Sequence, residues 1–261
     1  ERLVGSEMCI RDRRRGEETG FPYIATGHYA RVEFDGAAGR WLLKKGLDEN
    51  KDQSYMLWSL TQWELSRLLL PLGGLTKERV RQLAEEHGFL NARKRDSQDI
   101  CFERLVGSEM CIRDSRYAGK EFPPGAFVGT QGQVYGQHKG IIHYTVGQRK
   151  GLGLSFPQPM FVKELDVEKN RVVLAKAEEL FSQEVIARDI NLISVESIPA
   201  PLRVKARVRY RQKEQPATVL QTGPDELRVV FDQPQRAVTP GQSLVLYDGD
   251  TVVGGGKIAR K

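Results

Sequence analysis

The sequence predicts an α/β segment followed by two β-rich segments, the last of which has the pattern of a small β-barrel. Three observations support this order. Residues before 102 combine short apolar runs with an amphipathic helix, residues 116–178 are punctuated by glycine, and residues 179–261 hold several short strands separated by turns. The chain has 261 residues, of which 39% are hydrophobic, so it can bury the cores of one to three domains. No apolar run is long enough to predict a membrane-spanning helix.

A perfect repeat must be set aside before the elements are assigned. Residues 1–12 and 103–114 both spell ERLVGSEMCIRD, with no other self-similarity in the chain. An internal duplication is one explanation, but structural repeats diverge and tile the chain at a fixed period. We therefore interpret 1–15 and 103–115 as non-native segments and exclude them from the fold prediction.

The α/β segment is predicted to span residues 16–102. FPYIATGHYARVEF and WLLKKGL predict two strands of an α/β sheet, and the apolar positions of residues 51–70 predict a helix that ends at Pro71. A second helix should begin after Thr76, which is a good N-cap, and should stop at Gly88.

Two β-rich domains are predicted to follow. Residues 116–178 contain hairpin-sized apolar runs separated by glycine, which predicts a small central β domain. Residues 179–261 contain short strands with turn signals at 222–225, 240–241 and 248–250, which predicts a β-barrel.

Charge and cysteine content narrow the class of partner and of site. The net charge is +6 and the isoelectric point is near 9.2, which favours a polyanionic partner such as nucleic acid. The three cysteines form no Cys-x-x-Cys pair, and the four histidines have no ligand-like spacing. We expect neither a disulfide framework nor a structural metal, and we expect a reducing, cytoplasmic location.

The clearest physical signal lies in LRVKARVRYRQK, where basic residues occupy every second position. These residues are Arg203, Lys205, Arg207, Arg209, Arg211 and Lys213. On a strand they would share one face, with Val204, Ala206, Val208 and Tyr210 on the other. A solvated strand protected from edge aggregation would need only one or two such charges, so we predict binding to a phosphate backbone.

Three further sequence motifs are weaker signals, and each allows two interpretations. Cys101 in KRDSQDICF could be a buried apolar residue or a reactive thiolate, because Lys94 and Arg95 favour the thiolate while Asp96 and Asp99 oppose it. YTVGQRKGLG, residues 144–153, could bind phosphate or form a solvated hairpin loop. Gly27 could let a ligand approach the backbone or could simply end a strand.

Seven segments in the same order carry a family resemblance. They are ATGHYAR, KDQSYML, LPLGGLTKERVRQLAEEHG, DSQDICF, GQHKGIIHYTVGQRKGLG, VRYRQ and TPGQSLVLYDGD. This series, from about residue 20 to residue 258, resembles the bacterial tRNA-specific 2-thiouridylases (the MnmA or TrmU family). The resemblance implies the C-terminal part of a Rossmann-like ATP-pyrophosphatase (PP-loop) domain, then a central β domain, then a tRNA-binding β-barrel.

The resemblance also implies a reaction and its residues. In this family ATP adenylates the C2 oxygen of the wobble uridine, and a cysteine persulfide, charged by a sulfur-donor protein, delivers sulfur to C2. A second cysteine forms a disulfide as the sulfur leaves, and AMP is released. By resemblance, Cys101 carries the persulfide and Gly27 contacts ATP. Mg²⁺ could bind together with the ATP. The implied tRNA contacts are His28, Lys51, Asp52, Gln53, Arg209, Tyr210 and Gln242.

Two departures from the family pattern shape the functional prediction. The family's Ser-Gly-Gly-x-Asp-Ser phosphate loop and its first catalytic cysteine have no counterpart in this sequence. We therefore expect an ATP-dependent tRNA sulfurtransferase whose chain, as written, has negligible catalysis but retains tRNA binding. A non-catalytic RNA-binding module is the main alternative, and a relative that adenylates another substrate is a third.

Overall fold

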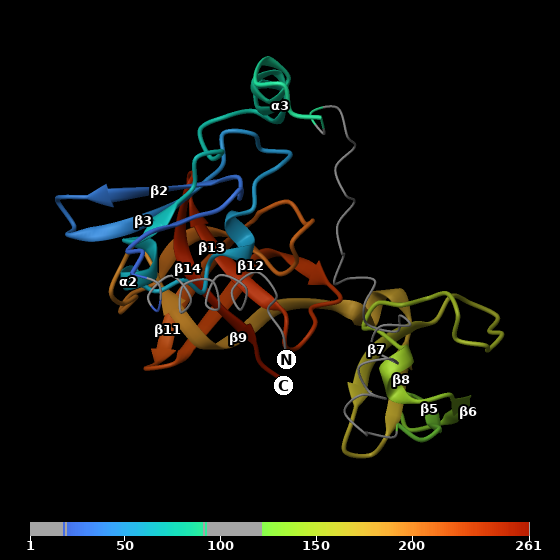
Figure 1. Cartoon of the computed structure of the whole chain (residues 1–261). Coiled ribbons are helices and arrows are strands. Elements are labelled where there is room, and N and C mark those ends of the chain that lie inside the picture. Colours follow the sequence, from blue (N-terminus) through green and yellow to red (C-terminus); the bar gives the residue numbers. More distant parts are fainter. Residues whose placement is uncertain (1–17, 19, 91, 93–121, 261) are drawn as a thin grey trace. The chain divides into compact units, whose positions relative to one another are not determined.

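The computed structural model describes residues 18, 20–90, 92 and 122–260 (Figure 1). The chain divides into two compact units. The first unit contains the described residues of Glu1–Lys94, Gln183–Gln233 and Pro240–Lys261. The second contains those of Arg95–Ser182 and Pro234–Thr239.

A closed six-stranded barrel forms the centre of the first unit. Its strands are β9 Phe181–Leu192, β10 Leu202–Arg207, β11 Gln215–Gly223, β12 Glu226–Arg236, β13 Ser243–Asp248 and β14 Thr251–Ile258. They follow the order β13-β10-β11-β12-β9-β14, and the pairing of β13 with β14 closes the ring. Alternate residues such as Val204, Ala206 and Leu246 are buried, as expected for strands that turn one face towards a core. The predicted β-barrel is therefore confirmed.

The two strands predicted in the N-terminal segment do not lie in one α/β sheet. β2 Ala30–Asp35 and β3 Arg40–Lys45 form an antiparallel hairpin that extends the barrel sheet, where Lys44 pairs with Thr251 of β14. The parallel pairing in this part joins β1 Ile24–Ala25 to β4 Leu68–Leu69. A single sequence indicates strand character but not the partner, so it could not assign the hairpin to the barrel.

The single helix predicted across residues 51–70 is wrong. The segment forms a 3₁₀ turn η1 Ser54–Met56, a short helix α2 Gln62–Leu65 and the strand β4. Its apolar side chains pack in one cluster with Val245, Tyr247 and Val252 of the barrel. The apolar side chains of this segment therefore reach the barrel core from a turn, a short helix and a strand instead of from one face of a single helix. The missed signal was the capping box at Thr61 and Glu64, which starts a new helix.

The helix predicted after Thr76 is confirmed. α3 spans Lys77–Glu86, and the Thr76 side chain accepts a hydrogen bond from the Arg79 amide at 3.2 Å. The chain leaves the helix through Gly88, whose φ is +71°.

The second unit is the predicted central β domain. Its sheet has the order β6-β5-β8-β7, from β5 Gly125–Gly129, β6 Val134–His138, β7 Phe161–Asp166 and β8 Arg171–Ala175. Strands β5 and β8 are parallel. Two 3₁₀ turns, η2 Ile141–His143 and η3 Ala177–Leu180, complete it. Its core includes Phe127, Tyr144, Leu152, Val162 and Leu174.

Candidate functional site

Gly27 and His28 lie in the turn that follows β1. Gly27 is exposed, and a Cβ there would meet only the Cδ1 atom of Leu72 at 3.6 Å, an ordinary contact. Neither its φ nor its packing requires a glycine. His28 Nδ1 lies 2.9 Å from Thr26 Oγ1, and burial lowers the pKa of His28, which favours the neutral imidazole at neutral pH.

Residues 51–53 lie beside this turn because Gln53 binds the backbone of Tyr29. The Gln53 amide donates to the Tyr29 carbonyl at 2.9 Å, and the Gln53 side-chain oxygen accepts from the Tyr29 amide at 3.0 Å. Lys51 is half-buried, and its amide donates to the Asp48 carbonyl at 2.9 Å. These bonds therefore bring Gln53 close to His28, which directly precedes Tyr29 in the chain.

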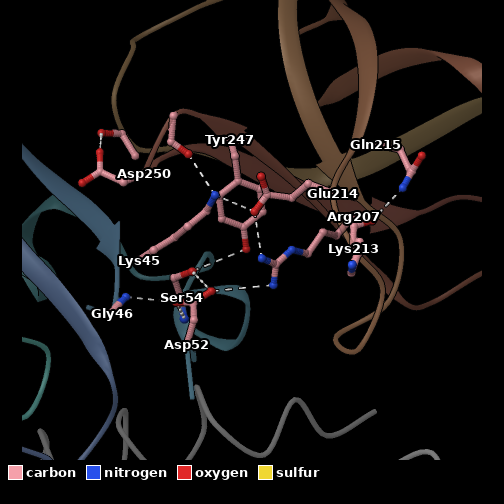
Figure 2. Close-up of polar contacts among 12 residues, drawn as sticks. Lys45, Gly46, Asp52, Ser54, Arg207, Lys213, Glu214, Gln215, Tyr247 and Asp250 are labelled. Carbon is pink, nitrogen blue, oxygen red and sulfur yellow. Dashed lines mark hydrogen bonds and ion pairs between the residues drawn. The ribbon is translucent and has the colours of Figure 1, made fainter. Parts of the chain in front are cut away.

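The Asp52 carboxylate points into the protein (Figure 2). Its Oδ1 accepts from the amides of Gly46 at 3.2 Å and Ser54 at 3.1 Å, and its Oδ2 accepts from Ser54 Oγ at 3.0 Å. The side chain is only 3% exposed, and Oδ2 lies 3.6 Å from Arg207 Nη1. Both carboxylate oxygens therefore act within the protein, and they hold the loop that carries Lys51 and Gln53.

Arg207 extends this contact into a network of charges that are buried or half-buried. Its Nη2 lies 2.8 Å from Glu214 Oε1, which also accepts from Lys45 Nζ at 2.6 Å. The Tyr247 ring lies beside both cations, 5.0 Å from the Arg207 guanidinium carbon and 4.8 Å from Lys45 Nζ. Burial raises the pKa of Tyr247, so its hydroxyl stays protonated, 3.5 Å from Ser54 Oγ. Figure 2 shows that the network joins the loop at Asp52 to the barrel.

The predicted basic strand is confirmed in part. Arg207 pairs across the sheet with Val245 and Lys205 pairs with Tyr247, so both lie on the face opposite buried Ala206. The strand ends at Arg207, however, so the strand alternation does not extend to Arg209, Arg211 and Lys213. Arg203 is held by both carboxylate oxygens of Asp232 at 2.8 Å. The prediction of six like charges on one strand face is therefore wrong, because the strand ends at Arg207. Acids from neighbouring strands and loops also neutralise Arg203 and Arg207, which the local pattern does not reveal.

Arg209 and Tyr210 lie in the loop between β10 and β11, next to the Asp52 loop. The Tyr210 hydroxyl donates to the Asp52 carbonyl at 3.5 Å, and its ring centroid is 5.9 Å from that of Tyr55. Two segments more than 150 residues apart thus meet at one place. The half-buried Arg207, two residues before Arg209, also connects these two segments through its ion pairs with Asp52 and Glu214.

Gln242 immediately precedes β13. Its carbonyl accepts from the Ile258 amide at 2.8 Å, while its side-chain oxygen is buried and has no hydrogen-bond partner among the described residues. The next residue, Ser243, accepts from the Tyr55 hydroxyl at 2.7 Å and from Trp58 Nε1 at 2.9 Å. Gln242 is therefore linked to the Asp52 loop through the segment that packs on the barrel.

The predicted site residues thus share the first unit, except Cys101, which lies outside the described residues. Sequence reasoning missed three partners in the network around Arg207, which are the half-buried Lys45 and Glu214 and the buried Tyr247. One signal was available for Glu214, because it is the only acidic residue between 203 and 224. In the described ranges, no group of three or more His, Cys, Asp or Glu residues could hold a metal ion. No helix within these ranges is long and apolar enough to cross a membrane.

Comparison with known protein families gives three consecutive domains, of which the first and the last contribute most of the first compact unit. Residues 10–104 match the tRNA methyl transferase HUP domain, residues 115–176 the tRNA methyl transferase PRC-barrel domain, and residues 182–258 the aminomethyltransferase β-barrel domain. These matches confirm the predicted order of an α/β nucleotide-binding type of domain, a small β domain and a barrel.

Individual relatives show the same likeness over nearly the whole chain. The tRNA-specific 2-thiouridylase MnmA of Clostridioides difficile is 47% identical over 247 residues, which cover 95% of this chain and 68% of the relative. The chain belongs to the tRNA-specific 2-thiouridylase family. The MnmA of Acetivibrio thermocellus is 50% identical over 92% of this chain and 66% of its own length, and MnmA 1 of a Thermoanaerobacter species is 50% identical over 92% and 65%. The chain thus spans about two thirds of the length of these relatives.

Proposed function

We propose that the chain is a tRNA-uridine 2-sulfurtransferase that uses ATP to place persulfide sulfur on C2 of the wobble uridine of tRNA. The relatives that share about half of its residues are named for 2-thiouridylation of tRNA. In this proposal Cys101 carries the persulfide, a separate donor protein supplies the sulfur, and the reactive thiol requires a reducing compartment such as the cytoplasm.

The contact between Tyr210 and Asp52 is the observation that carries the tRNA-binding part of the proposal. The hydrogen bond from the Tyr210 hydroxyl to the Asp52 carbonyl brings Lys51, Gln53 and Arg209 into neighbouring loops of one unit. A cluster of Lys, Arg, Gln and Tyr side chains offers the groups that contact phosphate, sugar and base in RNA. We propose that these residues, with His28 and Gln242, face tRNA.

Asp52 has a different role in the proposal from its neighbours. A buried carboxylate that accepts from two amides and a hydroxyl and lies beside Arg207 is not available to RNA, and its charge would repel phosphate. We propose that Asp52 positions Lys51 and Gln53 and meets tRNA, if at all, through its backbone.

The lack of a packing reason for glycine at position 27 supports a site for ATP there. An alanine Cβ at this exposed position would have room in the protein, so the local packing gives no reason for glycine. A glycine lets a ligand come close to the backbone, and we propose that the nucleotide is that ligand.

The reaction is tested with unmodified tRNA, ATP and a low-molecular-weight persulfide as sulfur source. Nucleosides are analysed by mass spectrometry after digestion of the tRNA. Because the sequence predicts negligible catalysis by the chain as written, we expect tRNA binding with at most a trace of 2-thiouridine from the wild-type sequence. We expect no 2-thiouridine from Cys101→Ser, because serine cannot carry a persulfide. If tRNA binds but no 2-thiouridine forms, and Cys101→Ser changes nothing, the chain acts as the non-catalytic RNA-binding module instead.

The tRNA surface is tested by Arg209→Ala. We expect about tenfold weaker tRNA binding and a smaller dependence of affinity on salt, because one phosphate contact is lost. The matched control is Arg228→Ala, which removes an arginine of the barrel that is 2.6 Å from Glu184 and is proposed to have no RNA contact. Equal losses of affinity in both variants would contradict the assignment of Arg209.

A further inference from the structure

The second unit contains a loop with an exposed turn, in which several backbone amides and two cationic side chains form no hydrogen bond or ion pair with the described residues. We propose that residues 147–153 form a phosphate-binding site for the RNA backbone, separate from the surface of the first unit. This inference rests on the proposed function for its ligand, a tRNA, and deepens it by assigning a second contact region.

The loop is held rigidly from within. The Gln148 side-chain oxygen accepts from the Thr145 amide at 2.9 Å, and its side-chain nitrogen donates to the Lys150 carbonyl at 2.9 Å. Two further bonds tie the loop to β7, from the Gly147 amide to the Val162 carbonyl at 2.7 Å and from the Val162 amide to the Gln148 carbonyl at 2.9 Å. A loop braced in this way loses little conformational entropy when a ligand binds.

Buried side chains fix the two ends of the loop, and the turn between them is exposed. Val146 and Leu152 are each 7% exposed, and Leu152 belongs to the core of the unit. Between them, Arg149, Lys150 and Gly151 are exposed. The buried Val146 and Leu152 therefore hold these three residues at the surface, and the side chains of Arg149 and Lys150 remain available for a ligand.

The cationic side chains and several backbone amides of this turn have no partner in the described part of the chain. Arg149 and Lys150 form no ion pair there, and the amides of Arg149, Lys150, Gly151 and Gly153 donate no hydrogen bond. The φ angles of Gly151 and Gly153 are +78° and +70°, and a Cβ on Gly153 would meet nothing within 4 Å. Successive free amides in a turn with left-handed residues form a concavity that binds anions, and two adjacent cations strengthen it.

The charge distribution of the surrounding sequence supports the same ligand. Residues 122–163 contain no Asp or Glu, although the chain has 34 acidic residues in all. The same stretch contains Lys139 and Lys163 besides the pair in the loop. A solvated hairpin loop needs neither the internal brace nor an acid-free surrounding, whereas a site for the phosphates of RNA is favoured by both.

The test compares tRNA binding by the wild-type chain and by Arg149→Ala/Lys150→Ala over a range of salt concentrations. We expect about tenfold weaker binding at about 0.1 M salt and a slope of log affinity against log salt that is smaller by about 1.5, because two cations no longer neutralise phosphates. The control is Lys169→Ala/Lys176→Ala, which removes the same charge from the same unit at positions beside Asp166 and Glu179. The control should bind as the wild type does.

A third variant, Gln148→Ala, keeps both cations and removes the brace. It should weaken tRNA binding several-fold with an unchanged salt slope, since the charge is retained and only the order of the loop is lost. An unchanged affinity in Arg149→Ala/Lys150→Ala, or an equal loss in the Lys169→Ala/Lys176→Ala control, overturns the inference while the proposed function stands. Failure of the wild-type chain to bind tRNA overturns both.

Binding experiments with inorganic phosphate and AMP show whether the loop binds the phosphates of RNA or those of a smaller ligand. If Arg149→Ala/Lys150→Ala loses binding of AMP or phosphate but keeps full affinity for tRNA, the loop binds a mononucleotide or free phosphate and the RNA assignment is wrong. A further outcome is that millimolar phosphate or AMP competes with tRNA only weakly, and equally for the wild type and for Arg149→Ala/Lys150→Ala. In that case a loss of tRNA affinity in the variant assigns the loop to the RNA backbone.

Discussion

Replacement of Arg207 by alanine is expected to lower the free energy of unfolding of the first unit by about 3–5 kcal/mol. Arg207 lies between Asp52 and Glu214, whose side chains are 3% and 11% exposed. Without the guanidinium, two carboxylates remain largely buried with only Lys45 near Glu214. Thermal unfolding followed by circular dichroism should show a midpoint lower by about 6–15 °C, given the size of the protein.

The matched control for this prediction is Arg203→Ala on the same strand. Arg203 also forms a salt bridge, with Asp232, but the two side chains are 61% and 44% exposed. Exposed pairs contribute at most about 1 kcal/mol because water screens them. If Arg207→Ala and Arg203→Ala destabilise the protein equally, the network in Figure 2 does not hold the Asp52 loop to the barrel.

The Arg207 variant also tests whether Arg207 positions the proposed tRNA-binding loops or contacts tRNA directly. Arg207 is half-buried and contacts Asp52 in the loop that carries Gln53 and meets Tyr210, so its loss should weaken tRNA binding at temperatures where the barrel is still folded. We expect this loss of affinity with little change in the salt dependence, because Arg207 is already neutralised within the protein.

Gly73→Ala is the second substitution with a large expected effect. A Cβ at Gly73 would lie 1.7 Å from the Ala30 carbonyl oxygen, so the 70–75 turn and β2 would have to move apart. The Gly73 carbonyl also accepts from the Leu47 amide at 2.9 Å, and this bond would be strained by the same movement. We expect a loss of about 3 kcal/mol or more in the free energy of unfolding, measured by urea denaturation.

The adjacent glycine provides the control. A Cβ at Gly74 would meet nothing within 4 Å, and its φ is not in the left-handed region. Gly74→Ala should therefore change the free energy of unfolding by less than about 1 kcal/mol and could stabilise the protein, because alanine reduces the entropy of the unfolded chain. Similar losses in the two variants would show that the turn does not pack on β2 as described.

Patterns within a few residues predicted much of the local structure. Thr76 and Gly88 bounded α3, the glycine-separated runs of residues 116–178 gave the central β domain, and the turn signals after residue 179 gave the barrel strands. Local patterns failed where long-range packing decided the structure. Residues 51–70 had enough apolar spacing to suggest a helix, yet their side chains pack across the barrel instead.

The sequence by itself determined the family, the order of the domains and the residues at which tRNA is proposed to bind, because its motifs and strand periodicity are local properties. Only the tertiary structure showed that Asp52 points inward, that Arg203 and Arg207 are neutralised by acids from other segments, and that the β2–β3 hairpin belongs to the barrel sheet. The physical reason is common to all three. Burial, ion pairing and strand partnership depend on residues far apart in the chain, and one sequence does not reveal which distant segments meet.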